Sequence, residues 1–129
     1  MTGNRLRAGV AVGVALLAGV AGTLALRSGQ PAGPALVSLS SQAFRPARVV
    51  VTAGVPVTWL DGDRQGHTVT ADDGSFDSHP GCSYGIDCMQ RGDRFRSVFD
   101  RPGTFRYHCR LHGGPGGAGM SGEVVVRLP

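Results

Sequence analysis

The stretch TFRYHCRLHGGPGGAGMSG, residues 104–122, decides the fold and carries most of the candidate chemistry. Its first half alternates, so that Phe105, Tyr107 and Cys109 fall on one face of a strand and His108 falls on the other with the arginines. The two aromatic side chains mark their face as the inward one. Cys109 should therefore point inward where the strand gives way to a loop, and His108 should point outward, which makes it a poor ligand candidate.

Short strands separated by turn signals continue through the rest of residues 35–129. Dipeptides and tripeptides such as Asp-Gly, Arg-Gly-Asp and Arg-Pro-Gly mark the turns, and no convincing amphipathic helix or internal repeat is present. This pattern predicts an all-β fold, an antiparallel Greek-key β-sandwich with one core that includes Trp59 and Phe76. The expected strands are 35–39, 49–53, 57–60, 67–71, 95–99, 104–109 and 122–128.

The N-terminus has a different character from the rest of the chain. Residues 8–26 form an unbroken run of 19 small or apolar residues, with Arg5 and Arg7 before it and Arg27 after it. Such a run predicts a hydrophobic helix that is either a membrane anchor or a cleaved signal peptide. Both readings place the rest of the chain outside the cytoplasm, as a cell-surface, periplasmic or secreted domain. We divide the chain into this segment at 1–27, a linker at 28–35 and a folded domain at 36–129.

The basic character of the chain comes mainly from that N-terminal segment. The whole chain has a formal charge of +4, but residues 28–129 contain 10 arginines against 9 acidic residues. The remaining arginines are spread out and form no basic run, which argues against a nucleic-acid partner. A chain of 129 residues is also too short for a two-domain enzyme with a large substrate cleft.

Three residues of the 104–122 stretch have metal-binding side chains: Cys109, His112 and Met120. A second histidine must come from elsewhere, and His67 opens another β-rich segment. Thiolate and thioether are soft ligands and imidazole is borderline, a combination that suits copper in both oxidation states. The Cys-x2-His pair alone is also common in zinc sites, but a later Met on a glycine-rich loop favours copper.

Several motifs, taken in order, resemble the plastocyanin and amicyanin branch of the cupredoxins, the blue copper proteins. The resemblance extends from about residue 36 to residue 128. The matching pieces are Phe44–Pro46, Val49–Gly54, Val57–Trp59, His67–Thr70, Gly74–Ser78, Phe105–Cys109, His112 and Gly117–Gly122.

This resemblance implies an eight-stranded Greek-key sandwich with one copper ion bound by His67, Cys109, His112 and Met120. It further implies one-electron transfer by Cu(II)/Cu(I) cycling. Because the loop would expose a ring edge of His112, we expect redox protein partners to dock near that residue, and we expect a monomeric protein. The sequence departs from the family in the loop after His112, where Met120 follows eight residues later, in a loop longer than that of plastocyanin. Gly66 and Asp61 also stand where relatives often have Pro and Asn.

Two further cysteines, Cys82 and Cys88, lie in an inserted loop at residues 81–93. Outside the cytoplasm we expect a disulfide between them, which would leave Cys109 as the single thiolate. A second metal site with His79, or two free thiols, are the alternatives. His79 and Met89 are otherwise expected to be ordinary loop residues.

The sequence leaves two classes of function open. The first is an electron carrier, and the alternative is a copper-binding protein for storage, delivery or resistance. A metal-dependent enzyme is disfavoured, because no second metal centre and no spare acid–base pair accompany the candidate ligands.

Overall fold

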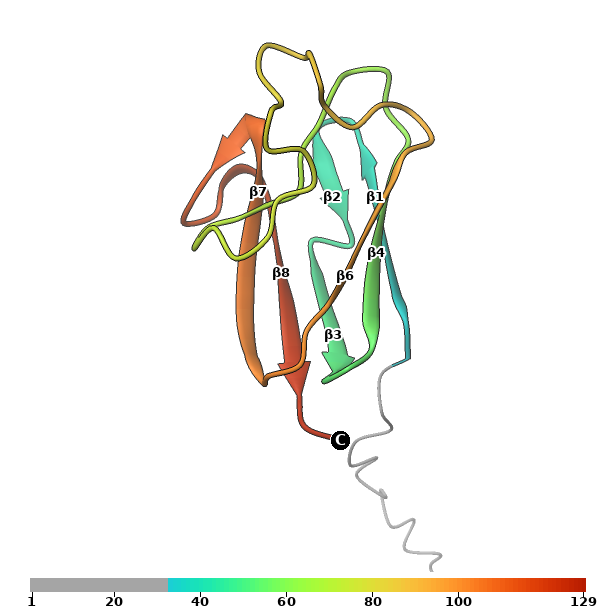
Figure 1. Ribbon diagram of the computed structural model, residues 1–129, viewed down its shortest axis with the longest axis vertical. Coiled ribbons are helices and arrows are strands. Elements are labelled where there is room, and N and C mark those ends of the chain that lie inside the picture. Colours follow the sequence, from blue (N-terminus) through green and yellow to red (C-terminus); the bar gives the residue numbers. More distant parts are fainter. Residues whose placement is uncertain (1–32) are drawn as a thin grey trace, which may run out of the picture.

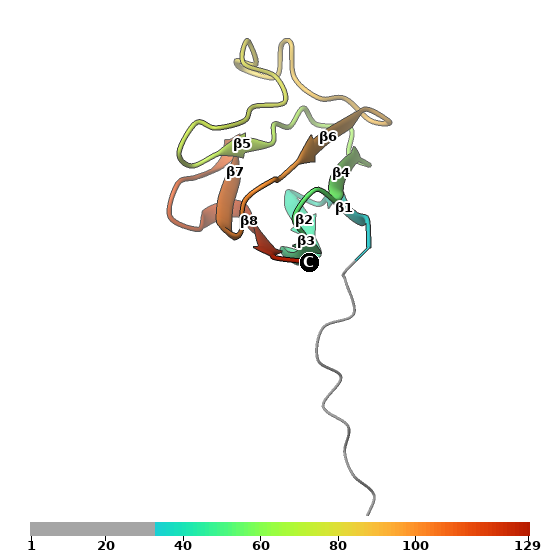
Figure 2. The same ribbon diagram turned by 60° about the horizontal axis from the view of Figure 1, so that its bottom comes forward.

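Two four-stranded sheets pack face to face in residues 33–129, the part of the chain that the computed structural model describes (Figures 1 and 2). The strands are β1 (Ala35–Ser40), β2 (Ala43–Arg45), β3 (Arg48–Thr52), β4 (Pro56–Asp61), β5 (Thr70–Ala71), β6 (Arg94–Val98), β7 (Gly103–Gly114) and β8 (Ala118–Arg127). The expected all-β sandwich is confirmed in these residues.

The sheets are mixed, which corrects the expectation of purely antiparallel pairing. One sheet has the order β2-β1-β4-β6 and the other has the order β3-β8-β7-β5. Strand β1 runs parallel to β4, and β3 runs parallel to β8, while the other pairs are antiparallel. The parallel pairs arise because the chain changes sheets between β2 and β3 and again between β3 and β4, so the paired strands are not consecutive.

Strands β7 and β8 extend into the stretch after residue 109 that the sequence predicts to be a loop. At residues 67–71, by contrast, only the two residues of β5 join the ladder. His67 instead forms an isolated backbone bridge with Met89. The hydroxyl of Thr68 accepts a hydrogen bond from the backbone N–H of Arg110 at 3.0 Å. These contacts hold residues 67–69 apart from the regular sheet and beside β7.

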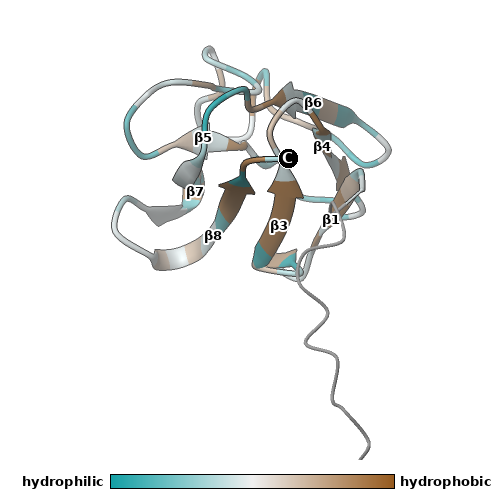
Figure 3. Cartoon of the chain, turned by 90° about the horizontal axis from the view of Figure 1, so that it is seen from below, coloured by the Kyte–Doolittle hydropathy of each residue, from teal (hydrophilic) through white to brown (hydrophobic). Residues whose placement is uncertain are grey.

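Aromatic side chains fill the space between the sheets. Trp59 and Tyr107 are fully buried and meet edge to face at 5.3 Å, and Phe76 and Phe95 pack against Trp59 at 6.1 and 5.6 Å. Figure 3 shows the hydrophobic colouring concentrated on strands such as β3 and β8, with hydrophilic loops around them. The predicted core positions of Trp59 and Phe76 agree with this packing.

The two ends of the sandwich are formed by different parts of the chain. Strand β1 begins, and the chain ends after β8, at the bottom of Figure 1, whereas long connections gather at the top. The predicted N-terminal hydrophobic helix lies outside the described residues. Within residues 33–129, no helix is long and apolar enough to cross a membrane.

Candidate metal centre

Cys109 and His112 lie in β7 where that strand stops pairing regularly with β8. The ladder is regular up to residue 108 and resumes at residue 113, so residues 109–112 lie opposite a single residue of β8, Met120. In a regular strand, residues three apart point to opposite faces. The bulge breaks this alternation, so Cys109 and His112 can point to the same side.

The close approach of the two strands beyond the bulge depends on glycine. A Cβ atom on Gly113 would lie 2.5 Å from the carbonyl oxygen of Met120, and one on Gly119 would lie 2.4 Å from that of His112. No side chain fits at such distances from backbone atoms, so these two glycines set the hairpin geometry. Gly119 also has a φ of 59°, in the left-handed region that favours glycine.

His67 reaches the same place from the connection between β4 and β5, and its ring is fully buried. Its backbone is fixed by a two-bond bridge to Met89, with N–O distances of 3.2 and 2.9 Å. Its Nε2 lies 2.9 Å from Oδ2 of Asp63. The two carboxylate oxygens of Asp63 also accept hydrogen bonds from the backbone N–H groups of Ser41 (at Oδ1) and Gln42 (at Oδ2). If Nε2 donates its proton to Asp63, the lone pair on Nδ1 is free to bind a metal.

Three ligand atoms converge at the centre of the site. The Sγ of Cys109 lies 3.7 Å from Nδ1 of His67 and 3.6 Å from Nδ1 of His112, and the two nitrogens are 3.2 Å apart. The point equidistant from these atoms is about 2 Å from each, close to zinc–ligand bond lengths of about 2.0–2.3 Å for imidazole and thiolate. A proton can bridge only one pair of these atoms, whereas one metal ion can bind all three, so the arrangement fits a metal.

The thiol of Cys109 is electrostatically prepared to bind a cation. Burial opposes its ionisation, but His67, His112 and the backbone N–H groups of Thr68 and Leu111 stabilise the thiolate and lower its pKa to about 6. The N–H of Thr68 lies 3.4 Å from the sulfur. In the absence of metal, burial also opposes charge on His67, but contacts with Cys109 and Asp63 raise the pKa of His67 above its ordinary value.

The other residues discussed from the sequence do not contribute atoms to the three-atom cluster. Met120 is buried opposite the ligand-bearing bulge, and its role as a copper ligand stays a prediction. His108 points away from the three ligand atoms, as expected, but it is buried and its Nδ1 lies 2.7 Å from Asp72.

Met89 is not an ordinary loop residue, because it is fully buried and its backbone holds His67. His79 is half-buried rather than solvated, because the turn at residues 77–79 packs against Arg110.

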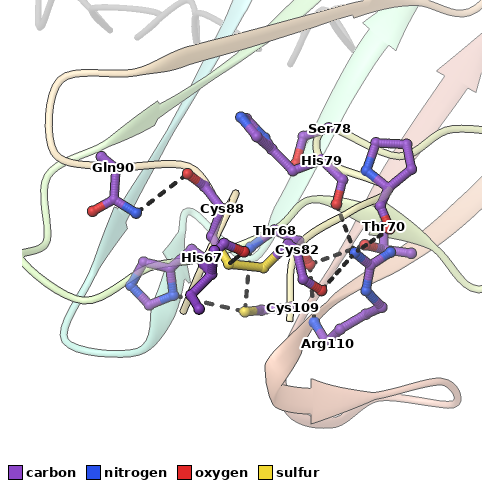
Figure 4. Close-up of a disulfide and its surroundings, with 12 residues drawn as sticks. His67, Thr68, Thr70, Ser78, His79, Cys82, Cys88, Gln90, Cys109 and Arg110 are labelled. Atoms are coloured by element: carbon purple, nitrogen blue, oxygen red, sulfur yellow. Dashed lines mark hydrogen bonds between the residues drawn. A yellow bond between two sulfur atoms is a disulfide. The ribbon is translucent and has the colours of Figure 1, made fainter. Parts of the chain in front are cut away.

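A disulfide joins Cys82 to Cys88 beside the three converging residues. Figure 4 shows it between His67 on one side and Arg110 on the other. The guanidinium of Arg110 forms an ion pair with Asp77 and donates hydrogen bonds to three carbonyl oxygens of the segment leading into the disulfide.

Sequence reasoning missed both Asp63 and Arg110. The only signals were the position of Asp63 four residues before His67 and that of Arg110 directly after Cys109.

Comparison with known proteins gives consistent matches. The model of the family "Copper binding proteins, plastocyanin/azurin family" matches residues 36–127. A plastocyanin from Scenedesmus fuscus is 30% identical over 65% of this chain and 86% of its own length. A chloroplastic plastocyanin from Tetradesmus obliquus is 32% identical over 65% of this chain and 58% of its own length.

Solved structures show the same fold. A reduced amicyanin variant is 26% identical, with a TM-score of 0.55 over 74% of this chain and 83% of its own. A copper-containing nitrite reductase from Thermus scotoductus also aligns with a TM-score of 0.55, over 74% of this chain but only 23% of the reductase. At 21% identity that second likeness extends to the fold alone.

Proposed function

Because this chain belongs to the plastocyanin/azurin family of copper-binding proteins, we propose that it carries single electrons between redox proteins outside the cytoplasm. His67, Cys109, His112 and Met120 would hold one copper ion. The convergence of three ligand atoms around one point is the observation that carries the proposal. Bound copper would supply a one-electron Cu(II)/Cu(I) couple.

The residues around the site suit a carrier because contacts within the domain fix their positions. Asp63 orients His67, the bulge of β7 orients Cys109 and His112, and the sandwich behind them is closely packed. A rigid ligand set resists rearrangement when the oxidation state changes, which favours fast electron transfer. The N–H of Thr68 is directed at the sulfur and lowers the electron density there. This hydrogen bond therefore influences the reduction potential of bound copper.

His112 supplies the route to the surface. Its ring is only half-buried, and it lines a groove of about 530 Å³, whereas His67 and Cys109 are fully buried. We therefore expect an electron to enter and leave through the edge of the His112 ring. We expect no enzymatic turnover and a monomeric protein.

An extracytoplasmic location is supported by two features. The Cys82–Cys88 disulfide is typical of oxidising compartments, and the N-terminal 19-residue apolar run is typical of export or anchoring. Whether that segment stays attached is tested by N-terminal sequencing of the protein isolated from its native cells: an intact Met1 or Thr2 indicates an anchor, and a start near residue 28 indicates cleavage.

Voltammetry of the copper-loaded protein tests the carrier function against the alternative of copper storage or delivery. A carrier gives a reversible one-electron wave and keeps its copper when mixed with a copper-free acceptor protein. A delivery protein binds Cu(I) preferentially and passes the ion to that acceptor. Irreversible reduction with loss of the metal would contradict the carrier proposal.

A further inference from the structure

Residues 82–88 form a small closed hairpin. The disulfide joins its ends, and Ser83 and Ile86 exchange two backbone hydrogen bonds of 3.0 and 2.9 Å. The two residues between them, Tyr84 and Gly85, have φ angles of 50° and 81°. Positive φ at both central positions is the pattern of the two-residue turns that suit tight hairpins. We call this element hairpin 82–88.

The tip of hairpin 82–88 holds apolar side chains out in solvent. Tyr84 is 96% exposed and Ile86 is 69% exposed, although the cysteines at the base are buried. A left-handed conformation is uncommon for a bulky residue such as Tyr84, and within residues 33–129 the side chain remains almost fully exposed. Tyrosine is enriched among the residues that dominate binding energy in protein interfaces.

Hairpin 82–88 is fixed relative to the candidate metal centre. Arg110, directly after Cys109, donates a hydrogen bond to the carbonyl oxygen of Cys82 and others to the segment before it (Figure 4). On the other side, Met89 directly follows the hairpin and holds the backbone of His67. An element tied at both ends loses little conformational freedom on binding, which favours affinity.

Tyr84 and His112 line the same groove, together with Leu111. An adjoining groove, which shares Gln42 and Gln65 with the first, is lined by Arg64. Arg64 is exposed and forms no ion pair within residues 33–129, because the neighbouring carboxylate of Asp63 is occupied by His67 and two backbone N–H groups. Asp87, on the hairpin, is exposed, and Asp63 lines the adjoining groove beside Arg64. The surface thus combines an apolar tip with an arginine in the adjoining groove that forms no ion pair within residues 33–129.

We propose that hairpin 82–88 is the docking element for an electron-transfer protein that offers an apolar surface to Tyr84 and Ile86 and a carboxylate to Arg64. The inference rests on the proposed function, because it assigns the partner surface of the same copper site. The described chain begins at the opposite end of the sandwich (Figure 1), so an N-terminal tether would leave this surface free to meet the partner.

Protein voltammetry on a surface of defined chemistry tests the proposal. The probe is a gold electrode coated with mixed methyl-terminated and carboxylate-terminated alkanethiols, which imitates the partner, and the sample is the copper-loaded full chain. Tyr84→Ser combined with Ile86→Ser should lower the interfacial electron-transfer rate at least about tenfold. The visible spectrum, the reduction potential and the reaction with hexacyanoferrate in solution should stay unchanged. Arg64→Gln should lower the interfacial rate less and weaken its dependence on salt.

A matched control removes two exposed apolar side chains from elsewhere in the domain. Leu36 and Leu128 are 55% and 69% exposed, and replacing both by Ser should leave the interfacial rate as it is in the wild type. An unchanged rate in the Tyr84/Ile86 variant, or an equal fall in the Leu36/Leu128 variant, would overturn the proposal. Two further results would overturn the proposal, each with an unchanged rate at the electrode. In the first, Tyr84→Ser slows electron exchange between two copies of the chain. In the second, Tyr84→Ser removes binding of the chain to anionic phospholipid vesicles.

Failure of the docking proposal is separable from failure of the proposed function. A reversible copper wave of the wild-type protein tests the carrier function alone. Adsorption of the copper-free chain to the same monolayer, measured by surface plasmon resonance, tests the hairpin alone. Equal adsorption of wild type and the Tyr84/Ile86 variant would refute the docking role even if the copper chemistry stands.

Discussion

The β7–β8 hairpin and the connection from residue 72 to residue 93 meet at the candidate metal centre but are held in different ways. The β7–β8 hairpin is a regular ladder interrupted by one bulge, and two glycines permit the close approach of its strands. The connection has almost no regular structure. Apart from backbone hydrogen bonds near its two ends, it is held by a disulfide, by Arg110 and by the backbone bridge from Met89 to His67. Backbone geometry therefore positions Cys109 and His112, whereas side-chain contacts and cross-links position the surroundings of His67.

The largest effect is expected from a methyl group placed in the β7–β8 hairpin. A Cβ on Gly113 would meet three backbone atoms of Ala118 and Met120 at 2.5–2.8 Å. Gly113→Ala should lower the free energy of unfolding by about 3 kcal/mol, since backbone must move to admit the atom, and should abolish normal copper binding. Urea unfolding and copper titration measure the two effects.

The neighbouring glycine supplies the control for that variant. A Cβ on Gly114 would make only an ordinary contact at 4.0 Å with Ala118, so Gly114→Ala should leave both the unfolding midpoint and copper binding near wild type. Equal effects of the two substitutions would show that close approach of the strands does not position the ligands.

The next largest effect concerns the attachment of the connection. Arg110→Ala removes the ion pair with Asp77 and the hydrogen bonds to three carbonyl groups. We expect a loss of about 2–3 kcal/mol in the free energy of unfolding, as is typical of hydrogen bonds to charged groups. Arg106→Ala, which removes an exposed arginine from the same strand, should change stability by less than about 0.5 kcal/mol. Hydrogen exchange in residues 77–88 should rise only in the Arg110 variant; unchanged exchange there would contradict the anchoring role.

Removing the disulfide should have a somewhat smaller effect. The loop between Cys82 and Cys88 is short, and closing a loop of that size stabilises the fold by about 2 kcal/mol in the chain-entropy model. Cys82→Ser combined with Cys88→Ser should therefore lower the unfolding midpoint and leave the visible copper spectrum unchanged. Loss of the copper spectrum in this variant would mean that the connection shapes the ligand set directly.

Asp63 tests how His67 is oriented. Hydrogen bonds from Ser41, Gln42 and His67 outweigh the effect of partial burial and hold the pKa of Asp63 below its ordinary value, so it is a carboxylate near neutral pH. Asp63→Asn keeps the shape of the side chain but removes its charge. We expect about a tenfold loss of Cu(II) affinity and a higher reduction potential, because a nearby negative charge stabilises the more positive ion. An unchanged reduction potential would show that the charge of Asp63 has no electrostatic effect on the metal.

Copper affinity should depend on pH in one direction. The pKa of Cys109 is lowered to about 6 and that of His67 is raised, so both groups hold protons below pH 6 in the copper-free protein. Protons then compete with the metal, and affinity should fall as the pH drops through 6 and level off above the raised pKa of His67. Competition titrations between pH 5 and pH 8 measure this. An affinity that is constant over this range would contradict the assignment of Cys109 and His67 as ligands.

The contrast between local backbone geometry and long-range side-chain contacts also explains which features the sequence could predict. The alternation of Phe105, Tyr107 and Cys109 is a local property of one strand, and the structure buries Tyr107 and Cys109 fully and Phe105 partly. The roles of Asp63 and Arg110 depend on contacts with residues 22 and 33 positions away, such as Ser41 and Asp77, which no local pattern encodes.

The mixed pairing of the sheets and the burial of Met89 were missed for related reasons. Which strands become neighbours depends on how the chain crosses between sheets. The burial of Met89 depends on a bridge to His67 across an irregular connection.

The visible absorption spectrum after addition of one equivalent of Cu(II) tests the central claim most directly. A thiolate bound to Cu(II) together with two histidines gives the intense blue colour of a blue copper site. We expect that colour in the wild-type protein, its loss in Cys109→Ser, and its retention in His108→Gln, which changes the adjacent residue on the opposite face. A colourless copper complex of the wild-type protein, or an undiminished blue colour in Cys109→Ser, would rule out a blue copper site at these residues.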